Sequence, residues 1–132
     1  MTALEVGQEL APATFIINRA RLLQYADASG DHNPIHQNEE FAKSVGLPDV
    51  IAHGMLTMGL AGEYLSAIAG SAAVLEFSAR FTKPVVVPAN TDVELIVSGK
   101  VASIEAGIAK IDLSAICNEI KVLGMAKASI RL

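Results

Sequence analysis

The stretch GMLTMGLAGEYLSAIA (residues 54–69) decides the architecture of this 132-residue chain. Apolar or small side chains point in almost every direction from a helix with this sequence; they belong to Met55, Leu56, Met58, Gly59, Leu60, Ala61, Gly62, Leu65 and Ile68. A helix that lacks a broad polar face is typical of one buried on most sides. We therefore expect other elements to wrap around residues 54–69.

Four segments after this helix alternate between apolar and polar residues, as half-buried strands do. They are residues 74–81, 92–104, 107–117 and 120–132. The segment PVVVP (residues 84–88) is bounded by prolines, which cannot donate to a ladder of backbone hydrogen bonds. We expect it to be an edge or a connector.

The residues before the long helix predict one short strand and two shorter helices. Residues 14–17 (TFII) fit a strand, and Asn18 is a suitable N-cap for the amphipathic helix that follows. Asn38 is a suitable N-cap for a second helix that stops at Gly46. Helices followed by a run of alternating strands predict one α+β domain over residues 1–132, with an antiparallel sheet wrapped around a long central helix.

Composition limits the partners of the chain. Hydrophobic residues make up 52% of it, which predicts a compact soluble protein with a real core. The formal net charge is -4, and Lys and Arg form no run. This balance argues against a nucleic-acid surface and against an anionic membrane surface. The apolar stretch 55–69 is interrupted by polar residues and is too short to span a bilayer comfortably.

The single cysteine, Cys117, excludes a disulfide framework and a zinc site built from cysteines. At an apolar strand position it is expected in the core. Residues 1–10 have neither the basic region nor the long apolar region of a signal peptide. A reducing cytoplasm is the expected compartment.

The stretch SGDHNPIH (residues 29–36) concentrates polar side chains where regular structure is unfavourable. Pro34 lacks a backbone donor and pushes the preceding residue toward an extended conformation, while Gly30 favours a turn. Asp31, taken alone, is most simply a turn residue that bonds its own backbone. The whole stretch nevertheless suggests a loop that carries chemistry.

Two blocks, YADASGDHNPIHQNEEFAK (residues 25–43) and IAHGMLTMG (residues 51–59), resemble the signature of MaoC-like dehydratases in order and spacing. That family contains (R)-specific enoyl-CoA hydratases and (3R)-hydroxyacyl-ACP dehydratase subunits. The resemblance implies the hotdog fold and reversible syn hydration of trans-2-enoyl thioesters to (3R)-3-hydroxyacyl thioesters in fatty-acid metabolism, with no cofactor. It places the catalytic pair on Asp31 and His36, and the oxyanion donor on the backbone N–H of Gly54.

These groups suit the reaction that the resemblance implies. Hydration requires that water lose a proton as its oxygen attacks C3, and that C2 gain one. A carboxylate and an imidazole that share one water serve both steps on one face, which explains a syn outcome. Which of Asp31 and His36 is the base is left open, because neighbouring groups titrate together. Asn33 is expected either to fix the loop or to orient the substrate carbonyl.

The oxyanion role of Gly54 has its own physical basis. His53 and Gly54 lie where the long helix begins, so free N–H groups and the positive end of the helix dipole face any anion placed there. Losing such a donor typically raises a barrier by about 3 to 4 kcal/mol. His53 is interpreted first as a partner for loop backbone and second as a substrate contact.

Two further features have competing interpretations. Gly59 and Gly62 lie three residues apart in a helix that they destabilise, so either close packing or room for an acyl tail is expected there. A metal site is conceivable from Asp31, His32, His36 and His53. No HxH or HExxH spacing occurs among them, so we expect no metal.

Three classes of function remain. The favoured one is a hydratase or dehydratase that acts on CoA or ACP thioesters as a homodimer, because the sites of the family lie near a subunit interface. The second is a catalytic subunit that needs a different hotdog chain, because IAHGMLTMG resembles two-component dehydratases. The third is a thioesterase or an acyl-thioester binder. The intact pair of Asp31 and His36 argues against the binder, and the MaoC-type placement of this pair on a loop before the helix argues against the thioesterase.

Overall fold

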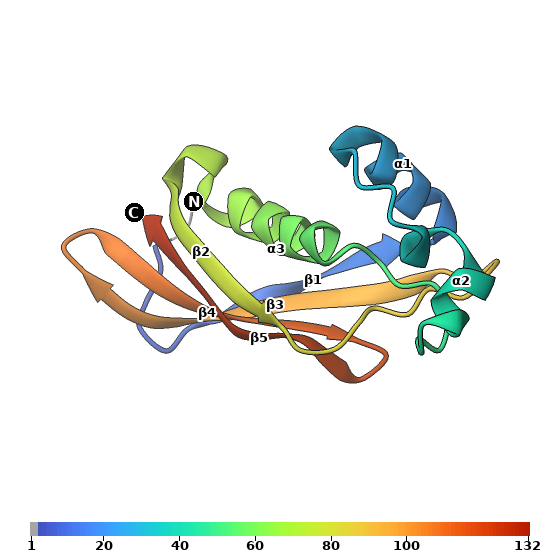
Figure 1. The fold of residues 1–132 in the computed structure, drawn as a ribbon. Coiled ribbons are helices and arrows are strands. Elements are labelled where there is room, and N and C mark those ends of the chain that lie inside the picture. Colours follow the sequence, from blue (N-terminus) through green and yellow to red (C-terminus); the bar gives the residue numbers. More distant parts are fainter. Residues whose placement is uncertain (1–2) are drawn as a thin grey trace.

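Helix α3 (Gly54–Ala69) lies along one face of a five-stranded antiparallel sheet in the computed structural model, shown in Figure 1. The structure describes residues 3–132. The strand order is β1-β3-β4-β5-β2, so β1 and β2 form the two edges of the sheet. This arrangement confirms the expected α+β architecture. A single domain over residues 1–132 stays a prediction, and residues 1 and 2 lie outside the described part.

The four strands predicted after the long helix are confirmed. The bounds of the strands are β1 (Glu9–Ile17), β2 (Val74–Phe81), β3 (Val93–Glu105), β4 (Ile108–Cys117) and β5 (Ile120–Arg131). The first strand is longer than the expected 14–17 because it continues through a shift of register between Leu10 and Ala13. Pro12 lies within this shift, where an edge strand tolerates a residue without a backbone donor.

The segment that contains PVVVP is a connector, as predicted. It pairs with the rest of the chain through an isolated bridge between Val86 and Ile51. On either side of this bridge, the Ala52 N–H donates to the Val85 carbonyl at 2.9 Å and the Val87 N–H donates to the Val50 carbonyl at 2.8 Å. The connector therefore fixes the short segment that leads into α3.

Both predicted helix caps are confirmed. The Asn18 side chain accepts a hydrogen bond from the Arg21 N–H at the start of α1 (Arg19–Ser29). The Asn38 side chain accepts one from the Phe41 N–H at the start of α2 (Glu39–Ser44). Two short 3-10 helices, η1 (Pro34–His36) and η2 (Ser71–Ala73), complete the elements.

Helix η1 corrects the expectation that residues 29–36 hold no regular structure. Pro34 occupies its first turn, where the missing N–H would have no helical partner in any case. Gly30 ends the preceding helix with a left-handed φ of 80°, which glycine adopts without strain. The loop therefore has a defined conformation, with a left-handed turn at Gly30 and a short 3-10 helix.

The prediction that α3 is buried on most sides is only partly right. Its buried residues, Leu56, Thr57, Leu60, Ala61, Tyr64 and Leu65, face the sheet and the connector. The opposite side is open in the described chain: Met55 is 58% exposed, and Gly59 and Glu63 are also exposed. A sheet covers one side of a helix, so apolar and small residues on the other side need a further partner to be buried.

Two remaining expectations are settled by burial and length. Cys117 is buried in β4, and burial raises the pKa of its thiol, as befits a core residue and not a nucleophile. Among the described residues, no helix combines the length and the apolar character that crossing a bilayer requires.

Candidate active site

Bonds between side chains and backbone hold the loop between α1 and α2, beginning with the Asp31 N–H, which donates to Ser29 Oγ at 3.2 Å. Asp31 Oδ1 accepts a hydrogen bond from the Asn33 N–H at 3.1 Å. Asn33 Oδ1 accepts one from the Ile35 N–H at 3.1 Å and so caps η1. The turn role of Asp31 is therefore real, and it occupies only one carboxyl oxygen. Asn33 holds the loop, while its contact with a substrate stays a prediction.

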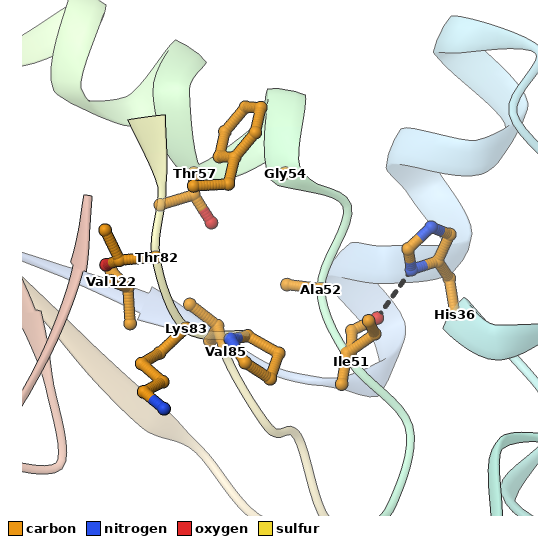
Figure 2. A pocket seen from close by; sticks show the side chains of 11 residues that line it. His36, Ile51, Ala52, Gly54, Thr57, Thr82, Lys83, Val85 and Val122 are labelled. Atoms are coloured by element: carbon orange, nitrogen blue, oxygen red, sulfur yellow. Dashed lines mark hydrogen bonds between the residues drawn. The ribbon is translucent and has the colours of Figure 1, made fainter. Parts of the chain in front are cut away.

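His36 is oriented by a backbone carbonyl. Its Nδ1 lies 2.7 Å from the Ile51 carbonyl oxygen, a contact drawn as a dashed line in Figure 2. A carbonyl oxygen can only accept, so Nδ1 carries the proton, and in the neutral ring Nε2 is left with a free lone pair. Nε2 is the nitrogen that would have to be free if His36 has the expected catalytic role, and that role stays a prediction.

The structure brings Asp31 and His36 together. His36 Nε2 lies 3.9 Å from Asp31 Oδ2, the carboxyl oxygen that the turn does not use. This distance is too long for a direct hydrogen bond and suits a pair bridged by one water. The two side chains differ in environment, since 8% of His36 and 51% of Asp31 is exposed. The carboxylate is therefore hydrated while the imidazole is enclosed.

His53 lies directly against this pair. Its Nε2 lies 3.0 Å from the Asp31 carbonyl oxygen, and its ring stacks on His36 with centroids 3.9 Å apart and an interplanar angle of 23°. Only 1% of the residue is exposed. Burial is the main cause that lowers the pKa of His53. The expected partnership with loop backbone is present as a contact, and a substrate role stays a prediction.

The N-terminus of α3 supplies free amide groups next to this pair. The His53 carbonyl accepts from the Leu56 and Thr57 N–H groups, at 3.1 and 3.3 Å. The N–H groups of Gly54 and Met55 precede the first helical bonds, and the His53 side chain makes no cap bond. Such amides attract an anion at the positive end of the helix dipole. The N–H of Gly54 thus precedes the helical hydrogen bonds, and its role as an oxyanion donor stays a prediction.

Phe81 covers Gly54. A Cβ atom added at Gly54 would lie 3.1 Å from Cε1 of the Phe81 ring, closer than ordinary van der Waals contact. Glycine therefore lets the aromatic ring rest on the first turn of α3. The ring comes from the end of β2, so the sheet and the helix meet at this point.

A cleft of about 290 Å³ opens beside these groups. Its walls combine apolar side chains with the His36 ring and the Thr57 hydroxyl; the apolar ones include Ile51, Ala52, Phe81, Val85 and Val122. Figure 2 shows His36 at one end of this space and Thr82 and Lys83 toward the other. His36 and Gly54 both line the cleft, whereas Asp31 reaches it only through His36.

Thr57, Phe81 and Lys83 line the cleft, and sequence reasoning did not single them out. Thr57 carried a usable signal, because it is the first polar side chain in an otherwise apolar or small start of the helix. Phe81 ends β2 and Lys83 follows this strand. Both join the site only through the fold, so no local pattern marks them.

Gly59 and Gly62 do not line this cleft. A Cβ atom at Gly59 would meet nothing within 4 Å, and one at Gly62 would only touch the Phe77 ring at 4.0 Å. Close packing on Gly59 is therefore not seen within the described chain. Room for an acyl tail on this side of α3 stays a prediction.

Asp31, His36 and His53 also form a cluster of three metal-ligand types, with candidate atoms within 4.8 Å of one another. His36 Nδ1 and His53 Nε2 already bond to backbone carbonyls, which leaves His36 Nε2 and His53 Nδ1 as the ring nitrogens that an ion would have to take. Histidine ligands of metals commonly make such second bonds, so these contacts do not argue against an ion. The expectation of no metal stays a prediction.

Comparisons with known proteins place this geometry in a family. A family model described as a MaoC like domain matches residues 3–114. The 3-hydroxyacyl-thioester dehydratase X of Mycobacterium tuberculosis is 44% identical over 77 residues, which cover 58% of this chain and 27% of that protein.

Solved structures extend the likeness over the whole fold. A MaoC-like dehydratase is 39% identical with a TM-score of 0.95, over 98% of this chain and 41% of that chain. The (R)-hydratase from A. caviae involved in PHA biosynthesis is 26% identical with a TM-score of 0.85, over 100% of this chain and 99% of that one. The hotdog fold is thereby confirmed. The chain spans less than half the length of the first two of these three relatives.

Proposed function

The chain belongs to the MaoC-like domain family, and from this premise we propose that it adds water reversibly to trans-2-enoyl thioesters to give (3R)-3-hydroxyacyl thioesters. The observation that carries the proposal is the free Nε2 of His36, 3.9 Å from Asp31 Oδ2, in a cleft that also reaches the first amide of α3. A syn hydration needs a group that transfers the proton, a group that orients the water and a donor to the thioester oxygen, all on the same side of the substrate.

His36 is the group that moves the proton in this proposal. The water between the pair gives one proton to His36 Nε2 as its oxygen bonds to C3, and it keeps its other proton as the new hydroxyl. The imidazolium then returns the first proton to C2 on the same face, which leaves the enzyme unchanged. Asp31 accepts a hydrogen bond from the water and stabilises the cation that forms on His36.

The N-terminus of α3 stabilises the charge that grows on the thioester oxygen. The Gly54 N–H has no helical partner and lines the cleft, so a carbonyl oxygen placed there meets a fixed donor and the positive end of a dipole. Such donors act most strongly when charge develops during the reaction. Phe81 and the apolar walls exclude water from the same space.

Two states of assembly are proposed. The open side of α3, with Met55 58% exposed beside Gly59, supports burial against a second chain. A homodimer is the simpler case, and a heteromeric (3R)-hydroxyacyl-ACP dehydratase, in which another hotdog chain supplies the acyl channel, is the alternative. A CoA or an ACP carrier and a cytoplasmic location stay predictions.

The acyl tail is proposed to run along this open side of α3. Gly59 and Gly62 leave room for the tail on this side. Side chains of the described chain do not enclose that space, so a second chain would have to close the channel. Gly59→Leu should shift kcat/KM toward short enoyl thioesters. Unchanged relative values for short and long substrates would refute this channel.

The experiment that tests the function follows the enone absorbance of a short trans-2-enoyl-CoA after mixing with the purified chain. Loss of absorbance without release of free thiol supports hydration. Activity that appears only when a second hotdog chain is added favours the heteromer. Thiol release with the enone intact would instead indicate a thioesterase, and binding without either change an acyl-thioester binder.

A further inference from the structure

We propose that His53 is a positioning residue that sets the separation and orientation of Asp31 and His36, an inference that rests on the proposed hydration. The mechanism above gives His53 no proton to carry. Its contacts nevertheless reach each part of the site, from a position immediately before the oxyanion amide of Gly54.

Three contacts tie His53 to the three parts. Its Nε2–H donates to the Asp31 carbonyl oxygen at 3.0 Å, across 22 positions of sequence. Its ring stacks on His36 at 3.9 Å between centroids. Its own carbonyl accepts the N–H of Leu56 and of Thr57 and so begins α3 beside Gly54. A shift of His53 therefore moves the carboxylate, the imidazole and the amide relative to one another.

The other ring nitrogen of His53 gives an independent reason to look for a role. Nδ1 is buried and has no hydrogen-bond partner in the described part of the chain. Since Nε2 carries the proton, Nδ1 holds a lone pair that nothing satisfies, and burying such a group costs free energy. A phenyl ring would avoid this cost and keep the stack on His36. What it would lose is the bond to Asp31.

An uncharged His53 also favours protonation of the neighbouring His36 ring. Burial lowers the pKa of His53, and the proximity of His36 adds to that lowering. A charge on His53 would oppose protonation of the ring stacked on it at 3.9 Å. A histidine that stays neutral lets His36 accept a proton while it still donates to Asp31.

Two variants separate the two contacts. His53→Phe keeps a ring against His36 and removes the donor, whereas His53→Gln keeps a donor and removes the ring. We expect each to lower kcat of the folded protein about tenfold to a hundredfold, as a misplaced catalytic group does. KM for a short enoyl-CoA should stay within about threefold, because the apolar walls of the cleft are untouched. His32→Phe and His32→Gln, at an exposed histidine of the same loop, are the matched controls.

A merely structural His53 gives a different result. Its variants would lower Tm and leave kcat per folded molecule equal to that of the His32 controls, and this outcome would overturn the proposal. If wild type and controls are inactive both alone and with a second hotdog chain, the proposed function fails, and a second measurement decides the inference alone. Nitrogen-15 NMR of the wild-type imidazoles should show His53 protonated at Nε2 and His36 at Nδ1. A neutral His53 protonated at Nδ1 would contradict the bond to Asp31.

Discussion

The side of α3 that faces the sheet and the segment just before its N-terminus are built on opposite principles. The first packs Leu60, Ala61 and Leu65 into the core, with exposures of at most 4%. The second buries His53 against His36 of η1, and within the described residues one ring nitrogen of His53 has no hydrogen-bond partner. Apolar burial stabilises a fold, whereas buried polar groups with unmet bonds cost stability. We therefore expect substitutions on the sheet side to change mainly stability, and substitutions at the N-terminal end to change mainly activity.

The largest effect is expected on turnover, from variants of the two side chains beside the N-terminus of α3. Asp31→Asn and His36→Ala should each lower kcat/KM by at least about a hundredfold, because each removes a group that orients or moves the proton. Asp31→Asn should leave Tm close to that of wild type, since its side chain is 51% exposed. Steady-state rates and thermal unfolding of the same samples provide the check. Rates near wild type in either variant would refute the assignment.

On the sheet side of α3 we expect the reverse result, which is a loss of stability without a loss of turnover. Leu65 is 0% exposed, so Leu65→Ala should reduce the free energy of unfolding by about 2 to 5 kcal/mol through lost burial and a cavity. Its kcat per folded molecule should match wild type. Urea unfolding and rates scaled to the folded fraction test this. A large fall in kcat with unchanged stability would erase the distinction between the two regions.

An intermediate effect is expected where the two regions meet. Gly54→Ala places a Cβ atom 3.1 Å from the Phe81 ring, which must shift in the cleft although the Gly54 N–H remains. We expect a fall of about tenfold in kcat/KM from this displacement. Because Phe81 is 55% exposed, its ring has room to move, so stability should change little. Adding Phe81→Leu should recover part of the rate in a double-mutant cycle, and strict additivity would show that the ring is not the cause.

The smallest effect concerns pH. The pKa of His53 is lowered from 6.5 by burial, so the unfolded chain binds its proton first as pH falls. This residue therefore leaves stability unchanged above pH 6.5 and reduces it progressively below that value, until the folded protein is protonated as well. His53→Phe should flatten this part of the stability curve, measured by urea unfolding between neutral and mildly acidic pH. A variant curve parallel to that of wild type would contradict it.

The sequence predicts the scaffold better than the site, for a physical reason. Strand alternation and the Asn18 and Asn38 caps are local signals, and each is confirmed in the structure. The open side of α3 was missed because small and apolar residues do not reveal which neighbour covers them. Asp31 and His36 were chosen from their loop and the family resemblance.

The remaining features of the site arise from tertiary contacts. The bond from His36 Nδ1 to the Ile51 carbonyl and the stack of His36 on His53 join segments 15 or more positions apart. The tautomer of His36 follows from the first of these bonds, and the proposed choice of His36 as the base rests on that tautomer. No local pattern carries that information.

In the proposed mechanism, one water between Asp31 and His36 supplies the hydroxyl at C3. Through His36, the same water also supplies the proton at C2, on the same face of the substrate. Hydration of a short trans-2-enoyl-CoA in deuterium oxide tests it most directly, because NMR of the product reads the relative configuration at C2 and C3. If one water serves both steps, deuterium and hydroxyl are added syn, with the 3R configuration. Anti addition, or a mixture of configurations at C2 formed on the enzyme, would contradict it.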